Sequence, residues 1–60
     1  MNKELVDIRE ILATAEAQLN IATHNEGITG EAIDSMNRAY WQGYVEALVY
    51  VIDNLDKVSA

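Results

Sequence analysis

Two runs of apolar residues in 3-4 spacing constrain this 60-residue chain more than any other feature of its sequence. Residues at this spacing lie on one stripe of an α-helix. The first run predicts a helix over about 3–25 and comprises Leu5, Ile8, Leu12, Ala15, Leu19 and Ala22. The second predicts a helix over about 30–57, and its best seam comprises Trp41, Tyr44, Leu48, Val51, Leu55 and Val58.

The segment between the two runs, 26–29, has the composition of a tight turn. Gly27 can take the left-handed conformation that ends a helix, and Thr29 can cap the next helix. Ile28 and Ile33 have the spacing of a hydrophobic staple around that cap. Because short connections join antiparallel neighbours, we expect one all-α domain, an antiparallel helical hairpin.

The second helix has more apolar surface than one neighbouring helix can cover. A second stripe lies beside its seam and comprises Ile33, Met36, Tyr40, Gly43, Ala47 and Tyr50, and the other flank carries Val45, Val49 and Ile52. The branched and aromatic residues also permit a β-strand over 45–52, but the 3-4 spacing continues to Val58 without a proline or a turn. A helix with an uncovered apolar surface is therefore the better interpretation.

Such a surface predicts association. A chain of this length buries only about 60% of its unfolded surface. It contains no cysteine, and the lone His24 cannot form a structural zinc site. We therefore expect a two-fold dimer, a four-helix bundle of two hairpins. The residues expected at the dimer or partner interface are Met36, Tyr40, Trp41, Gly43, Tyr44, Val45, Ala47, Leu48, Val49, Tyr50, Val51, Ile52 and Leu55.

Gly43 has two interpretations within this interface. Together with Ala47, one turn later, it would let the backbones of two helices approach closely. Alternatively, it is a tolerated helix glycine that costs about 1 kcal/mol relative to alanine. The sequence leaves both open.

Charge and hydropathy exclude several classes of protein. Ten acidic and four basic residues give a net charge of −6, which opposes direct binding to nucleic acid or to an anionic membrane. The longest apolar run, Ala47 to Ile52, is far shorter than the ~20 residues of a membrane span, and the N-terminus lacks the pattern of a signal peptide. We expect a cytoplasmic protein.

No pattern of catalytic, nucleotide-binding or calcium-binding residues occurs in the chain. His24 has no nucleophile placed beside it by the sequence, so a role at the end of the first helix is the simpler interpretation. Glu4, Asp7 and Glu10 recur at three-residue spacing, which suggests a cation site but is more often a solvated helix face. We expect no enzyme activity, no metal and no cofactor.

Three classes of function remain. The favoured one is a small interaction protein that dimerises and binds a larger protein as an inhibitor or adaptor, since inhibitors made by phages and other mobile elements have this size and charge. The second is an acidic nucleic-acid mimic that blocks a DNA- or RNA-binding protein, with Glu4, Asp7, Glu10, Glu16, Glu46 and Asp53 as its surface. The third is a purely structural or regulatory four-helix bundle, for which architecture alone implies no activity.

Overall fold

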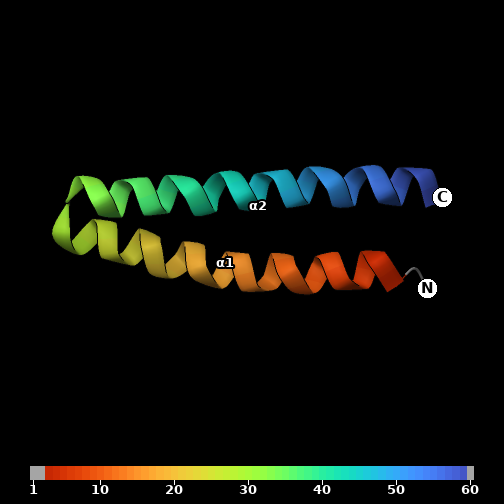
Figure 1. The fold of residues 1–60 in the computed structure, drawn as a ribbon, viewed down its shortest axis with the longest axis horizontal. Coiled ribbons are helices and arrows are strands. Elements are labelled where there is room, and N and C mark those ends of the chain that lie inside the picture. Colours follow the sequence, from red (N-terminus) through yellow and green to blue (C-terminus); the bar gives the residue numbers. More distant parts are fainter. Residues whose placement is uncertain (1–2, 60) are drawn as a thin grey trace.

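The computed structural model describes residues 3–59 and consists of two helices, α1 (Lys3–Thr29) and α2 (Ala32–Ser59). For residues 4 and 59 the description covers the helical backbone and not the side chain. The two helices lie side by side and antiparallel, with the start of α1 and the end of α2 at one end of the rod (Figure 1). The rod measures 44 × 15 × 12 Å. The all-α hairpin predicted from the sequence is therefore confirmed.

The connection between the helices is shorter than predicted, and α1 ends at Thr29 and not near residue 25. Gly30 takes the left-handed conformation, with φ of 63°, and its N–H donates to the Glu26 carbonyl at 2.9 Å. This is the cap that commonly ends helices at a glycine. Gly27 remains helical, because ending at Gly30 keeps almost one further turn of backbone hydrogen bonds.

Thr29 links the two helices through its hydroxyl group. The Oγ1 atom of Thr29 accepts a hydrogen bond from the Glu31 N–H at 3.2 Å and donates to the Asp34 carboxylate. The predicted cap position was wrong, because Thr29 is the last residue of α1 and α2 begins at Ala32. The Glu31 carbonyl accepts from the N–H groups of Asp34 and Ser35, which places Glu31 at the start of α2. The predicted staple residues Ile28 and Ile33 are both exposed.

The contact between the helices uses the predicted stripe of α1. Its six residues are all buried or half-buried, and Ala15, only 1% exposed, is the most deeply buried. Small residues at this position let the two helices lie close together. The prediction for α1 is confirmed.

The seam of α2 differs from the prediction. The seam comprises residues that are all buried or half-buried, namely Arg38, Trp41, Val45, Leu48, Ile52 and Leu55, and Asp34 and Ser35 near the start of α2 are half-buried as well. Tyr44, Val51 and Val58 are exposed. The predicted seam was therefore wrong at every second position. Val45 and Ile52 have no polar atom to keep hydrated, whereas burying Tyr44 would require a partner for its hydroxyl.

The hairpin has a thin core. Among the described residues no large side chain is fully buried, and Ile52, at 6% exposed, is the largest of the buried ones. The chain exposes 4435 Å², compared with roughly 3,900 Å² for a folded monomer of 6.7 kDa. The rod therefore leaves more surface in water than a folded chain of its mass usually does.

Candidate interaction surface

A second row of side chains runs along α2 next to the seam, and α1 does not cover it. The row keeps the same alternating 4-3 spacing as the seam, and every member is exposed. We call it the free stripe; it comprises Ile33, Asn37, Tyr40, Tyr44, Ala47, Val51, Asn54 and Val58. All but the two asparagines are apolar or aromatic. A row with this spacing has the geometry that packs against another helix.

Two aromatic rings of the free stripe, those of Tyr40 and Tyr44, contact the ring of Trp41, which belongs to the seam. The rings of Tyr40 and Trp41 meet edge to face, with centroids 5.1 Å apart and planes at 86°. The ring of Tyr44 lies 5.8 Å from that of Trp41 and 6.3 Å from that of Tyr40. Such mutual contacts are favourable beyond simple burial and hold the rings in place. The rings present a prearranged apolar wall on α2.

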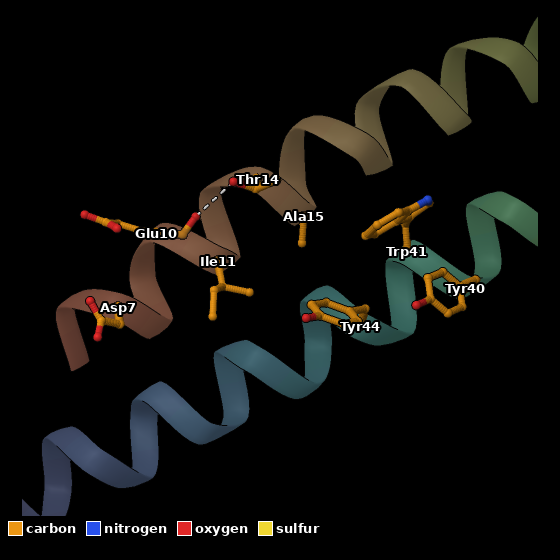
Figure 2. Close-up of a pocket in the computed structure, with 8 residues that line it drawn as sticks. All are labelled: Asp7, Glu10, Ile11, Thr14, Ala15, Tyr40, Trp41 and Tyr44. Carbon is orange, nitrogen blue, oxygen red and sulfur yellow. Dashed lines mark hydrogen bonds between the residues drawn. The ribbon is translucent and has the colours of Figure 1, made fainter. Parts of the chain in front are cut away.

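An open groove of about 550 Å³ lies between this aromatic wall and α1 (Figure 2). On the α1 side it is lined by Ile11 and Ala15, by Thr14, and by the carboxylates Asp7 and Glu10. The Thr14 hydroxyl donates to the Glu10 carbonyl at 3.2 Å, which is the dashed line in Figure 2. The groove is therefore apolar at its floor and acidic at its rim.

A second, smaller hollow of about 250 Å³ continues along α2. It is lined by Tyr44, Ala47, Leu48 and Val51. Tyr44 borders both hollows, so together they form one apolar surface along the middle of the rod. A partner that covers the free stripe would cover both hollows.

The opposite side of the seam is polar. Arg38 binds the Glu26 carboxylate through two nitrogen atoms, Nε at 3.1 Å and Nη2 at 3.3 Å. The Nη1 atom of Arg38 also donates to Gln42 at 2.7 Å, and Gln42 donates to Glu46 at 3.5 Å. Residues 38, 42 and 46 follow one another at four-residue spacing, which places them on one side of α2.

A second cross-helix ion pair joins Arg9 to Asp56, with 3.2 Å between Nη2 and Oδ2. Asp56 lies on the same flank of α2 as Arg38, since the two are eighteen residues or five helical turns apart. The hairpin therefore has two unlike faces. One carries cross-helix ion pairs, and the other carries exposed apolar side chains.

The polar face predicts a specific dependence of stability on pH. The hydrogen bond from Arg38, followed by one from Ser35, lowers the pKa of Glu26 below its ordinary value. Folding therefore favours the ionised carboxylate. Its stabilising effect is fully present above the ordinary pKa and is lost as the pH falls through the lowered value.

We expect Glu26→Gln to remove this contribution. The variant should have a lower urea midpoint than the wild type at neutral pH, and the two midpoints should converge in acid, below the lowered pKa of Glu26. Urea titrations followed by circular dichroism at a series of pH values measure this difference. A midpoint difference that stays constant down to the lowest pH would show that ionisation of Glu26 contributes nothing to stability.

The structure divides the residues that the sequence placed at an interface. Trp41, Val45, Leu48, Ile52 and Leu55 belong to the seam with α1, whereas Met36, Tyr40, Gly43, Tyr44, Ala47, Val49, Tyr50 and Val51 are exposed. Val45 and Ile52, predicted to be part of the uncovered surplus, are thus used within the hairpin. A Cβ atom added at Gly43 would meet nothing within 4 Å, so the hairpin itself does not require a glycine there.

The two asparagines of the free stripe were not identified from the sequence. Asn37 and Asn54 occupy positions where the 4-3 spacing continues but the residue is polar. A search for apolar residues alone passes over them. Continuing the 4-3 spacing along α2 regardless of residue type would have reached both asparagines.

The acidic residues do not form one surface. Asp7 and Glu10 lie at the groove, Glu46 lies on the polar face, and Glu16 and Asp53 are exposed; the side chain of Glu4 lies outside the described part of the chain. Among the described residues no three acidic, histidine or cysteine side chains come together as metal ligands. His24 is exposed near the end of α1.

No protein-family model matches the chain, and no similar protein was found among characterised proteins or solved structures. Within residues 3–59 neither helix is both long and apolar enough to cross a membrane. The surfaces described above are therefore the basis for a function.

Proposed function

We propose that this chain is a small, non-enzymatic interaction protein that pairs with itself through the free stripe and binds a larger protein as an inhibitor or adaptor. The paired form is a four-helix bundle of two hairpins. One observation carries the proposal. α2 exposes a complete second helix-packing row, while no large side chain among the described residues is fully buried.

The dimensions of the hairpin favour a contact along its whole length. A broad face of 44 by 15 Å offers roughly 660 Å², close to the ~800 Å² per partner of a standard interface. A contact restricted to one half of the rod would fall well short of that area. Two-fold pairing satisfies the requirement with a single surface that is complementary to itself.

Pairing through the free stripe leaves the polar face for the larger protein. The chain carries a net charge of −6, and both of its arginines are already engaged, Arg38 with Glu26 and Arg9 with Asp56. A partner with a basic surface would be attracted to this face, and electrostatic attraction mainly accelerates and orients such encounters.

The nucleic-acid mimic is the weaker alternative. Its proposed carboxylates are divided between the groove and the polar face, whereas a mimic of a phosphate backbone needs them in one row. The two proposals differ in their dependence on salt, because attraction between exposed charges is screened at high ionic strength. Binding to the larger protein should fall steeply with salt for a mimic and only moderately for a protein that uses mixed apolar and polar contacts.

Self-association can be tested by fluorescence, since Trp41 is the single tryptophan of the chain and lines the groove. In a dimer the groove is covered, and dilution should expose the indole ring to water. We expect the emission maximum of Trp41 to shift to longer wavelength on dilution. An emission spectrum that is independent of concentration across the micromolar range, with native helicity throughout, would contradict self-association.

Gly43→Leu tests whether α2 is closely approached at its centre. Within the hairpin the substitution meets open space and replaces a poor helix former, so helicity should be retained or increased. Overpacking at a helix contact typically costs about 1 to 3 kcal/mol, so the dimer should weaken by roughly ten- to a hundredfold. Sedimentation equilibrium measures this change. The matched control is Ala39→Leu, at another exposed position of α2, and it should leave the dimer intact.

A further inference from the structure

We infer that the free stripe pairs with the free stripe of a second copy in antiparallel orientation and in one register, centred between Val45 and Glu46. This inference rests on the proposed self-association and specifies its geometry. It follows from the order of residues in the stripe and from the side chains around it.

The free stripe is symmetric about the centre of α2, which spans Ala32–Ser59. Its members form pairs, and the two members of each pair lie at equal distances on either side of the bond between residues 45 and 46. These pairs are Tyr44 with Ala47, Tyr40 with Val51, Asn37 with Asn54, and Ile33 with Val58. Antiparallel pairing of two such helices places the two members of each pair opposite one another.

The pairs are complementary in size. Tyr44 of each copy faces Ala47 of the other, and because Gly43 lies one turn before Ala47, both small residues leave room for the ring. Tyr40 likewise faces the smaller Val51. The end pairs combine two branched aliphatic residues, Ile33 and Val58. Each layer therefore joins a large side chain to a smaller one or two of moderate size, as close packing requires.

The asparagines select the register. In the hairpin, the Nδ2 atom of Asn54 donates to the Tyr50 carbonyl at 2.8 Å, which directs its amide and leaves Oδ1 to accept a further hydrogen bond. Asn37 of the second copy can donate to that oxygen. A single polar position in an apolar helix contact commonly fixes register in this way, because any other alignment leaves the amide without a partner.

Other arrangements are less complementary. A shift of one heptad places Asn37 opposite Ala47 and Tyr40 opposite Tyr44, or else places Asn54 opposite Tyr44. A parallel arrangement places each tyrosine opposite its own copy and Ala47 opposite Ala47, which crowds one layer and leaves a gap in the next. It also aligns the two helix dipoles unfavourably.

The same register accounts for the acidic rim of the groove. Tyr40 of the second copy lies over Val51, towards the end of the groove where Asp7 and Glu10 are found. A tyrosine hydroxyl that is removed from water requires a hydrogen-bond partner, and these carboxylates can accept from it. The groove is thus completed by a residue of the second copy.

Cysteine crosslinking tests the register, and the natural chain contains no cysteine. Asn37→Cys and Asn54→Cys are prepared separately, one with a tag that alters its mass, and are treated with a short bis-maleimide alone and as a mixture. Two copies of the same variant should not crosslink, because positions 37 and 54 are seventeen residues or roughly 25 Å apart along the helix. The mixture should give one crosslinked product that contains both variants.

A second pair of variants, Ile33→Cys and Val58→Cys, tests the same register at the ends of the stripe. Ala39→Cys mixed with Asn54→Cys is the negative control, since residue 39 lies outside the stripe. Sedimentation equilibrium establishes that each variant is dimeric, and circular dichroism establishes that it is helical.

The outcomes separate this inference from the proposed function. Mixed crosslinks for both pairs support the register. Crosslinks within Asn37→Cys alone or Asn54→Cys alone indicate parallel pairing and overturn it, as does a helical dimer with no mixed crosslink from either pair. If the wild-type chain is monomeric, the proposed self-association is itself wrong.

Discussion

The substitution Val51→Asp should convert the dimer into helical monomers. Val51 is 41% exposed in the hairpin and belongs to the free stripe, so a carboxylate there remains hydrated until two copies associate. Pairing would then remove two carboxylates from water, one in each copy. Burying a polar group without a partner costs about 2 to 7 kcal/mol and an isolated charge costs more. We expect the dissociation constant to rise at least a thousandfold, which corresponds to about 4 kcal/mol.

Val49→Asp provides a matched control. Val49 is 44% exposed, carries the same side chain and lies only two residues away, but it belongs to the flank of Arg38 and Asp56. The variant should remain dimeric with unchanged helicity. Sedimentation equilibrium of the two variants at equal concentration makes the comparison. If both dissociated, or if neither did, the free stripe would not be the surface of association.

Ile52→Asp should have a larger effect, the loss of the folded hairpin. Ile52 is the largest buried side chain of the described residues. Truncation of a buried isoleucine to alanine already costs about 2 to 5 kcal/mol. The whole stability of a small domain is only about 5 kcal/mol or somewhat more, so a buried charge should exceed it.

The control for this variant is Tyr50→Asp, since Tyr50 is 71% exposed on the same turn of α2. Circular dichroism should show helical content close to the wild type for Tyr50→Asp and a largely unfolded spectrum for Ile52→Asp. A cooperative urea transition in Ile52→Asp, with normal helical signal before it, would mean that the seam assigned to α2 does not hold the hairpin together.

The sequence was sufficient to identify the buried stripe of α1. Apart from Ile11, positions beside that stripe, such as Asp7, Thr14 and Gln18, are polar, so no second complete apolar row competes with it. α2 is different. It carries two adjacent rows that are offset by one residue, and a row containing Trp41, Leu48 and Leu55 can be extended by either Tyr44 and Val51 or Val45 and Ile52. Periodicity cannot decide between them.

In the structure the seam also includes Arg38, whose guanidinium pairs with Glu26 across the two helices. A charged residue at a seam position is invisible to a search for apolar spacing. The predicted end of α1 at Gly27 was wrong for a comparable reason, because Gly27 and Gly30 are both able to end a helix and apolar spacing does not distinguish them.

The candidate surface was recognised from the sequence as an excess of apolar residues, but its members were only partly correct. The predicted interface included Tyr40, Tyr44, Ala47 and Val51. It left out the four other members of the free stripe, which are Ile33, Asn37, Asn54 and Val58. The division of α2 into a covered seam and a free stripe depends on where α1 lies. That position follows from the fold and not from the composition of α2.

Sedimentation equilibrium of the wild-type chain tests the central claim most directly. Measured from low to high micromolar concentration, the mass should approach twice the 6.7 kDa of the chain, with a helical spectrum in the dimeric range. A mass equal to that of one chain over the whole concentration range, with full helicity, would contradict the claim that a second copy covers the free stripe.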